Sequence, residues 1–385
     1  MSASPAGQPV SPGMPLGADA PHSNGTPPGA AIVSAAAVRG PLALEATGLG
    51  KDFRLGRGQV LHAVRDVSVS LYRGAVVALV GESGSGKSTV ARLLAGQESL
   101  TAGEISLDGH GVDLSSRRAF RHYKSEVQLV FQDPFSSLNP AHTVRYHLER
   151  PLRLHQGGRG QQVEEQVNAL LTQVRLTPAG QYVGKYPYEL SGGQRQRVSF
   201  ARALAAKPRV LLADEPVSML DVSIRLEMLG LLDDLRRDFE LAMLYITHDI
   251  ASARYFADEV LVMYAGEIVE RGPAEEVTQH PAHPYTQLLV AAAPDPDNLG
   301  STLRGGGPKR GARAETPATS AGCPFAPRCP LADDRCRAED PPLLQVSPSR
   351  GAACWRLDVA APDVLASGAD FRAVPESRGG GAMSI

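Results

Sequence analysis

The stretch from residue 75 to residue 96, AVVALVGESGSGKSTVARLLAG, constrains the fold more than any other part of the chain. A short apolar run leads into a glycine-rich loop, and apolar residues at helical spacing follow directly. A continuous apolar run with β-branched residues is typical of a strand that is buried on both faces of a parallel or mixed sheet. The stretch therefore predicts a strand, a loop and a helix of an α/β fold.

Residues 81–89, GESGSGKST, fit the pattern G-x-x-x-x-G-K-[ST] of a phosphate-binding loop. Its glycines let successive backbone N–H groups point at one anion, and the following helix adds the positive end of its dipole. Lys87 can reach the β- and γ-phosphates, and the Ser88 hydroxyl can ligate Mg²⁺. The residues predicted to bind the nucleotide are Gly81, Glu82, Ser83, Gly84, Ser85, Gly86, Lys87, Ser88 and Thr89. We therefore expect a nucleoside triphosphate site.

A second motif, VLLADEP at residues 210–216, is an apolar strand that ends in two carboxylates. Asp214 is placed to hold Mg²⁺, directly or through water. Glu215 could orient or deprotonate an attacking water. Asp-Glu pairs at solvated strand ends are common, but four apolar residues before this pair and a phosphate loop upstream favour the catalytic interpretation.

Further apolar runs complete the predicted α/β core. Strands are expected at residues 42–55, 127–131, 209–214 and 242–247, and helices at STVARLLAG and RQRVSFARALAA. Residues from about Pro140 to Arg202 look almost wholly helical. Residues 259–272 read as a hairpin that turns at Ala265-Gly266.

The stretch LSGGQRQR, residues 190–197, resembles the signature motif of the ATPase subunits of ABC transporters. Their other motifs follow in order: Gln132 matches the Q-loop glutamine, Asp221 the D-loop aspartate and His248 the switch histidine. Phe53 lies where the family places an aromatic residue against the adenine. The resemblance implies a P-loop ABC ATPase domain, with a RecA-like core, an antiparallel β subdomain and a helical subdomain.

The resemblance also implies roles for these residues. Two such domains pair head to tail, and ATP with Mg²⁺ lies between one phosphate loop and the opposite signature motif, here Ser191, Gly192, Gly193 and Gln194. Glu215 would be the catalytic base and His248 would stabilise developing charge. Gln132 would contact the Mg²⁺ site, with Ser88 and Asp214, and link it to the transported solute. Met219 replaces the usual alanine at the expected dimer interface.

The contexts GESGSGKST, FQDPFSSLNP, YPYELSGGQRQRV and HPYTQLL resemble the ATPases of bacterial oligopeptide and dipeptide importers. Such a subunit powers import of peptides through a multisubunit transporter. The same group includes systems for nickel and other small solutes, which is the alternative substrate class. A soluble ABC-type ATPase outside transport, or a metal-cluster sensor with a vestigial ATPase, is a further alternative. Intact Glu215 and His248 speak against the vestigial ATPase.

All four cysteines lie near the end of the chain, at Cys323, Cys329, Cys336 and Cys354, separated by five, six and seventeen residues. In a reducing cytosol such a set favours metal ligation over disulfides. Four thiolates suit a [4Fe–4S] cluster, and zinc is the alternative, although zinc sites usually begin with closer cysteine pairs. The importer ATPases often carry a C-terminal extension of the form C-P-F-x-P-R-C-P, which favours iron–sulfur. We expect the cysteines to staple a small appendage.

The domain organisation follows from these segments and from composition. We expect a disordered N-terminal extension at 1–41, rich in Pro, Gly, Ala and Ser, and the ATPase domain at 42–290, with its helical subdomain at about 140–202. A linker at 291–322, a Cys-rich extension at 323–356 and a flexible tail at 357–385 complete the chain. The N-terminus does not read as a secretory signal.

Charge and hydropathy limit the partners. The formal net charge of −2 gives no basis for binding nucleic acid, and no apolar run is long enough to span a bilayer. We expect a peripheral protein on the cytoplasmic face of the cell membrane. Its expected partners are transmembrane permease subunits, a second ATPase subunit, identical or paralogous, and indirectly an extracytoplasmic solute-binding protein.

Overall fold

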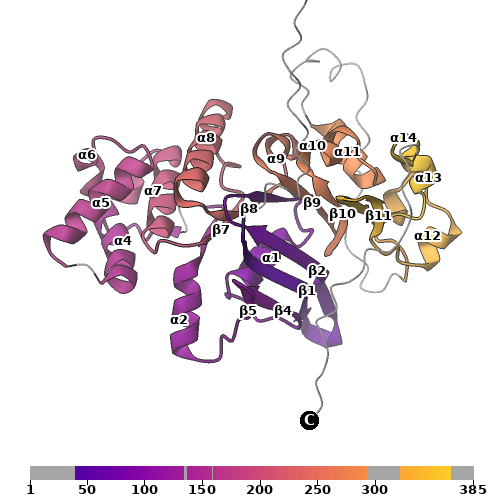
Figure 1. Ribbon diagram of the computed structural model, residues 1–385, viewed down its shortest axis with the longest axis horizontal. Helices are drawn as coiled ribbons and strands as arrows, with labels where there is room; N and C mark the ends of the chain where they lie inside the picture. The colour runs from indigo at the N-terminus through magenta and orange to yellow at the C-terminus, as the bar shows by residue number, and fades with distance from the viewer. Residues whose placement is uncertain (1–39, 134–136, 158, 294–320, 366–385) are drawn as a thin grey trace, which may run out of the picture.

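The computed structural model describes residues 40–133, 137–157, 159–293 and 321–365 (Figure 1). The predicted N-terminal extension except residues 40–41, most of the predicted linker and residues 366–385 of the predicted tail lie outside this part of the chain. The residues that it includes form two sheets with helices around them, so the α/β prediction is confirmed.

The larger sheet has the phosphate-loop strand near its middle. Within the described residues its strand order is β11-β12-β10-β9-β3-β8-β7-β6. The strands are β3 (Val76–Val80), β6 (Val127–Val130), β7 (Val210–Asp214), β8 (Ala242–Thr247), β9 (Glu259–Tyr264), β10 (Glu267–Pro273), β11 (Leu344–Ser347) and β12 (Arg350–Ala352). Strand β3 pairs in parallel with β8 and β9, and β7 pairs in parallel with β6 and β8. The strands predicted at 127–131, 209–214 and 242–247 are confirmed.

Strand β3 separates the two main apolar clusters of the protein. Val76, Ala78 and Val80 belong to one cluster. Val77 and Leu79 belong to the other. All five residues are buried because successive side chains of a strand point to opposite faces, and both faces of this sheet are covered. The continuous apolar run in the sequence has this cause.

The smaller sheet is antiparallel and has the order β2-β1-β4-β5. Its strands are β1 (Leu42–Arg54), β2 (Val60–Tyr72), β4 (Ala102–Leu107) and β5 (His110–Gly111), and the 3₁₀ turn η2 (Gly56–Gly58) joins β1 to β2. Strand β1 confirms the strand predicted from residue 42. Buried residues of β1 and β2 share an apolar cluster with β3 and helix α1 (Lys87–Leu94), so this sheet packs on the core beside the phosphate loop.

The helices between β6 and β7 lie at one end of the molecule, and the short helices of the C-terminal segment lie at the other (Figure 1). Those between β6 and β7 are α4 (Val144–Pro151), α5 (Gln161–Gln173), α6 (Gly180–Val183) and α7 (Gly192–Leu204), with the π-helical turn η3 (Leu152–Gln156) and the 3₁₀ turn η4 (Pro187–Glu189). The remaining helices are α2 (Arg117–Glu126), α8 (Val222–Phe239), α9 (Ile250–Phe256), α10 (Ala274–Gln279), α11 (Pro284–Ala292), α12 (Asp334–Ala338), α13 (Leu357–Ala360) and α14 (Pro362–Leu365). The described residues between Pro140 and Arg202 contain no strand.

Strands β9 and β10 form the predicted hairpin. They pair antiparallel, and Ala265 and Gly266 at the turn have positive φ values of 49° and 93°. Two central turn residues with positive φ match the right-handed twist of the flanking strands. The hairpin prediction is confirmed.

The C-terminal segment corrects two expectations. Residues 323–356 were predicted as a small appendage stapled by its cysteines. Instead, β11 and β12 extend the larger sheet through pairing of β12 with β10, and Phe325 is buried in the main core cluster. Residues 357–365 were predicted as part of a flexible tail, but they form α13 and α14, because Leu357 and Ala361 pack in an apolar cluster with Ala352.

A buried ion pair fixes this extension of the sheet. Glu270 of β10 and Arg350 of β12 have side chains that are 0% and 3% exposed, and Arg350 Nη2 donates to Glu270 Oε1 at 2.6 Å. The backbone N–H groups of Ala282 and His283 also donate to the Glu270 carboxylate, at 2.9 and 2.8 Å. Removal of Arg350 would leave the Glu270 charge buried without its ionic partner, which lowers the stability of the fold.

None of the helices in the described ranges has the length and apolar character needed to cross a membrane.

We expect Arg350→Met to lower the free energy of unfolding of the C-terminal segment by about 3–5 kcal/mol, because it leaves the Glu270 charge buried without its partner. Trp355, the single tryptophan of the chain, lies in this segment, so its fluorescence during urea unfolding gives the measurement. Arg337→Ala is the control, because the ion pair of Arg337 among the described residues is with the exposed Asp334. Equal unfolding midpoints for Arg350→Met and the wild type would contradict the role of the pair.

Candidate active site

Parallel pairing brings three motifs to one edge of the larger sheet. Strand β3 leads into the phosphate loop at residues 81–89, β7 ends at Asp214, and β8 ends just before His248. In the register, Val80 is opposite Thr247 and Asp214 is opposite Ile246. Because carboxyl ends of parallel strands meet at one edge, residues far apart in the sequence converge there.

The phosphate loop is held by close backbone packing that only glycine permits. A Cβ at Gly81 would lie 2.2 Å from the carbonyl oxygen of Met263, and one at Gly86 would lie 2.4 Å from that of Ala63. Gly86 also has a φ of 107°. The loop therefore packs closely between β9 and β2.

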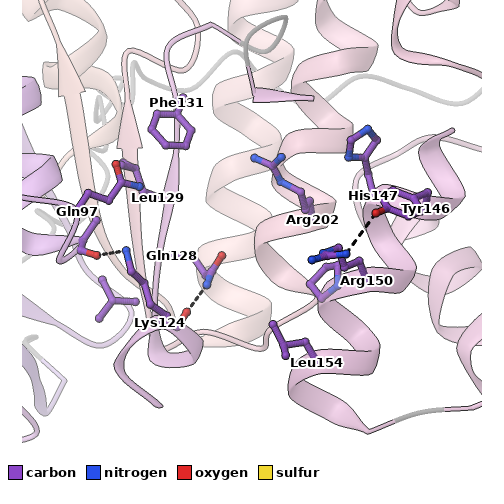
Figure 2. A pocket seen from close by; sticks show the side chains of 13 residues that line it. Gln97, Lys124, Gln128, Leu129, Phe131, Tyr146, His147, Arg150, Leu154 and Arg202 are labelled. Atoms are coloured by element: carbon purple, nitrogen blue, oxygen red, sulfur yellow. Dashed lines mark hydrogen bonds between the residues drawn. The ribbon is translucent and has the colours of Figure 1, made fainter. Parts of the chain in front are cut away.

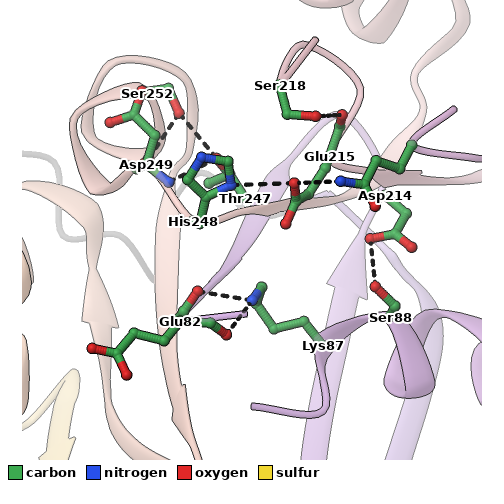
Figure 3. Close-up of polar contacts among 12 residues, drawn as sticks. Glu82, Lys87, Ser88, Asp214, Glu215, Ser218, Thr247, His248, Asp249 and Ser252 are labelled. Atoms are coloured by element: carbon green, nitrogen blue, oxygen red, sulfur yellow. Dashed lines mark hydrogen bonds and ion pairs between the residues drawn. The ribbon is translucent and has the colours of Figure 1, made fainter. Parts of the chain in front are cut away.

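Lys87 is buried at the start of α1, with 4% exposure. Its Nζ donates to the carbonyl oxygens of Gly81 and Glu82, both at 2.8 Å (Figure 3). Burial lowers the pKa of Lys87, and the charges of the nearby carboxylates, first that of Glu215, oppose this effect. The ammonium is thus held inside its own loop, where it is available to an anion that replaces those carbonyls.

Ser88 and Asp214 meet across the site. The Ser88 hydroxyl donates to Asp214 Oδ1 at 3.0 Å, and Asp214 is 5% exposed. Burial raises the pKa of Asp214, while the hydrogen bond from Ser88 opposes the rise. A hydroxyl and a carboxylate beside a phosphate loop are the oxygen ligands that Mg²⁺ prefers, so these two residues fit the predicted cation.

Glu215 lies at the centre of a polar cluster that joins three motifs (Figure 3). Its Oε2 accepts a hydrogen bond from Gln132 Nε2 at 3.0 Å and lies 3.2 Å from His248 Nδ1. The Glu215 backbone has a φ of 44°, which is strained for a residue with a side chain. Such strain persists only where the surroundings enforce it, and it is concentrated at functional sites.

The other loop residues differ in exposure. Ser83 and Gly84 are exposed at the loop tip, and Thr89 is half-buried in α1. Ser85 is buried, and its hydroxyl has no hydrogen-bond partner within the described ranges. Buried hydroxyls normally have partners, so this orphaned group fits a loop that receives a polyanionic ligand.

Phe53 is half-buried on β1 and pairs with Leu61, two residues from the Ala63 carbonyl that contacts Gly86. The ammonium of Lys51 lies 5.0 Å from the Phe53 ring centroid. The predicted adenine contact is therefore on the strand pair that adjoins the phosphate loop.

The signature residues form the N-terminus of α7. Ser191 Oγ accepts a hydrogen bond from the Gln194 backbone at 3.3 Å, and the Gln194 side chain accepts one from the Ser191 backbone at 3.0 Å. These two reciprocal hydrogen bonds form a capping box, so the side chains of Ser191 and Gln194 both have partners within the same helix end. The contacts among the described residues join none of these four residues to the phosphate loop of the same chain.

The D-loop residues lie next to the signature helix. A Cβ at Gly192 would lie 3.7 Å from a Leu220 methyl group, and one at Gly193 would lie 3.0 Å from a methyl group of Ile224. Asp221 is exposed at the N-terminus of α8, where its side chain makes no capping hydrogen bond, and Met219 is 61% exposed.

A groove of about 370 Å³ lies between α2, β6 and the helices that follow (Figure 2). Lys124 and Gln128 lie on one wall, and Arg150 and Arg202 on the other. Phe131, which immediately precedes Gln132, also lines it. The groove is therefore basic and partly apolar, and it adjoins the residue that contacts Glu215.

The four cysteines come near one another without forming a metal site. Burial raises the pKa of the Cys354 thiol to about 12, and the other three cysteines add to the rise. Burial also raises the pKa of Cys323, to about 11. Nevertheless, within the described ranges no group of three or more His, Cys, Asp or Glu side chains is arranged to hold a metal ion. The four predicted cluster ligands are therefore not arranged as a metal site in this part of the chain.

Two residues at the site were missed by sequence reasoning. The Tyr285 hydroxyl accepts a hydrogen bond from the Glu82 backbone N–H at 2.8 Å, and Arg328 pairs with the Glu82 carboxylate. Both lie in stretches that resemble the importer ATPases, HPYTQLL and CPFAPRCP. The sequence marked these stretches but did not indicate that they contact the phosphate loop.

Comparisons with known proteins agree with this geometry. Residues 64–218 match the family described as ABC transporter, and residues 269–336 match the C-terminal region of oligopeptide/dipeptide transporters. A probable peptide ABC transporter ATP-binding protein from Sinorhizobium fredii is 41% identical over 319 residues, which cover 83% of this chain and 89% of that protein. A di/tripeptide transport ATP-binding protein from Pseudomonas aeruginosa is 39% identical over 320 residues, which cover 81% of this chain and 96% of that protein.

Solved structures share the fold. An ATP-binding cassette in a dimeric post-hydrolysis state, bound to ADP and phosphate, has a TM-score of 0.55 and 28% identity, with 60% of this chain and 98% of that chain covered. The cbiO1 protein of Clostridium perfringens, part of an ABC transporter complex, has a TM-score of 0.55 and 26% identity, with 62% of this chain and 90% of that chain covered.

Proposed function

Since the chain belongs to the peptide ABC transporter ATP-binding proteins, and therefore to the ABC ATPases, we propose that its ATP hydrolysis powers the import of dipeptides and oligopeptides through a multisubunit transporter. The observation that carries the proposal is the convergence of Gln132 and His248 on Glu215 beside the phosphate loop. The peptide class is supported by the C-terminal match and by the names of the relatives. No observation favours nickel or a role outside transport.

The catalytic roles follow from the positions of the side chains. Lys87 would leave its loop carbonyls and bind the β- and γ-phosphates. Ser88 and Asp214, with Gln132 nearby, would hold Mg²⁺, which neutralises phosphate charge. Glu215 would accept the proton of the attacking water, and His248, 3.2 Å away, would orient that carboxylate and stabilise charge on the γ-phosphate.

A complete site would need a second ATPase subunit. Ser191 is exposed at the N-terminus of α7, next to the buried Gly193, and this helix end would bind the γ-phosphate of the opposite subunit. Asp221 and the exposed Met219 would lie at that interface. An exposed methionine adapts its shape to a partner, which suits a contact with an identical or a paralogous chain.

The basic groove is the proposed docking site for a membrane-spanning permease subunit. Lys124, Arg150 and Arg202 complement an acidic side chain, while Phe131 and Leu154 suit an apolar one. A helical segment that carries both would sit directly beside Gln132 and so reach Glu215. The protein would thereby be peripheral on the cytoplasmic face of the membrane, and an extracytoplasmic solute-binding protein would act through the permease.

The cysteine region carries a narrower proposal, that Cys323, Cys329, Cys336 and Cys354 hold a [4Fe–4S] cluster, with zinc as the alternative. The number of thiols and their gathering in one segment of the chain support it. Their arrangement requires a local rearrangement before any metal binds. No step of ATP hydrolysis depends on this group.

We expect Glu215→Gln to lower kcat for ATP hydrolysis by about 100-fold or more, because the amide cannot accept the proton of water. ATP affinity is expected to change by less than about threefold, since the base acts after binding. The rate is measured by phosphate release and the affinity by calorimetry. Glu275→Gln, an exposed change on α10, is the matched control. Wild-type turnover by the Glu215→Gln variant would overturn the assignment.

Reversal of charge in the groove tests the docking proposal. Arg150→Glu should prevent co-purification with the permease subunits of its transporter, because it repels the acidic segment, while ATP binding by the isolated subunit stays unchanged. Arg153→Glu is the control, since Arg153 lies one turn along and pairs with Glu149 outside the groove lining. Equal permease binding by both variants would place the docking site elsewhere.

Metal analysis tests the cysteine proposal. Protein purified without oxygen should contain about four irons and four sulfides per chain, and Cys329→Ser should remove them. One zinc without iron would replace the cluster with the alternative. The absence of both metals would overturn the proposal and show that the thiols are structural only.

A further inference from the structure

The C-terminal segment contacts the phosphate loop through one side chain. Arg328 Nη1 donates to Glu82 Oε2 and Arg328 Nη2 donates to Glu82 Oε1, both at 2.8 Å. The two residues are far apart in the sequence, and Glu82 is the second residue of the loop. A parallel pair of charge-assisted bonds is the strongest geometry available to an arginine and a carboxylate.

Aromatic rings fix the position of Arg328. The residue ends the 3₁₀ turn η5 (Ala326–Arg328), and its guanidinium carbon lies 5.6 Å from the ring centroid of Phe325 and 5.8 Å from that of Tyr264. Phe325 is 1% exposed and packs against Tyr264 and Tyr285. The guanidinium is therefore presented to the loop by packed side chains of the core.

Tyr285 holds the same loop residue by its backbone. Its hydroxyl accepts the Glu82 N–H at 2.8 Å, while His283 Nδ1 accepts the Tyr285 N–H at 3.0 Å and so caps α11. Glu82 thus has both its main chain and its carboxylate held by residues that follow β10. Figure 3 shows the carboxylate pointing away from Lys87.

The charge of Glu82 matters because the loop must receive a triphosphate. A carboxylate on this loop repels the bound anion, and the repulsion is weakened when an arginine neutralises it at contact distance. The Glu82 side chain is 37% exposed, so without Arg328 its orientation would be free. Arg328 of the C-terminal segment is the residue whose side chain holds this carboxylate in the described part of the chain.

We propose that Arg328 is a positioning residue that neutralises Glu82 and turns it away from the triphosphate, so that the C-terminal segment sets the nucleotide affinity of the loop. This inference rests on the proposed ATP site. It assigns to the cysteine-containing segment a role in ATP binding that requires no metal.

The test is a charge cycle on the full-length chain, with affinity for a non-hydrolysable ATP analogue and Mg²⁺ measured by calorimetry. Arg328→Gln should weaken binding by roughly fivefold to twentyfold at low salt, because the Glu82 charge is left unpaired. Arg328→Gln combined with Glu82→Gln should return the affinity to within about twofold of wild type. Arg328→Lys, which keeps the charge but loses the paired geometry, should fall between.

Salt dependence separates this electrostatic role from a structural one. The loss caused by Arg328→Gln should shrink as the salt concentration rises, because screening weakens the repulsion. Arg337→Ala, an exposed change in the same segment, is the control and should bind as wild type. Trp355 fluorescence reports whether the segment stays folded in each variant.

The outcomes are distinct. Failure of the wild type to bind the analogue would overturn the proposed function itself. Wild-type binding together with unchanged binding by Arg328→Gln would overturn only this inference. Weak binding by both Arg328→Gln and the double variant, at all salt concentrations, would also overturn it, because Arg328 would then act as a structural anchor. If Arg328→Gln does not fold, Arg328→Met, which also removes the charge, gives the same comparison with and without Glu82→Gln.

Discussion

The structure depends on the close backbone packing that holds the phosphate loop between two strands. Gly81 lies against the carbonyl of Met263 on β9, and Gly86 lies against that of Ala63 on β2. These strands belong to different sheets, so the loop packs against both sheets, which also contact each other directly. A Cβ at either glycine would clash with a backbone carbonyl oxygen, so the loop or the strand would have to move. The fixed loop also gives Lys87 and Ser88 their positions relative to Asp214, which buried strands hold in turn.

Three carboxylates surround the phosphate loop, and they lie on two different sides of it. Asp214 is buried and bonded to Ser88, while Glu215 is tied to Gln132 and His248 at the rim. Glu82 faces the opposite direction, toward Arg328. The loop therefore has carboxylates on both sides, and each is paired within the chain. The Arg328 guanidinium offsets the charge of Glu82, whereas the Ser88 hydroxyl and the Gln132 amide are neutral donors that orient Asp214 and Glu215 without removing their charge.

An ion pair, strand pairing and apolar packing join the C-terminal segment to the core, and Cys323 and Cys329 take part in that packing. The buried pair of Glu270 and Arg350 adds β12 to the sheet, and Phe325 packs on Tyr264 and Tyr285. The sequence predicted an appendage held by its cysteines because four thiols lie close together in the chain. That prediction did not include the contributions of Arg350 and Phe325.

The sequence by itself determined the buried strands, the hairpin at Ala265-Gly266 and the identity of the residues around Glu215, because strand burial, turn geometry and phosphate binding each require particular residue types at fixed spacing. Only the tertiary structure decided which distant groups meet. The pairing of β12 with β10, the contact of Arg328 with Glu82 and the turn of Glu82 away from Lys87 depend on how the chain returns to the sheet after the ATPase motifs. Contacts of this kind cannot be read from the sequence, because the residues around an arginine or a glutamate do not show whether its side chain is solvated or paired with a distant residue.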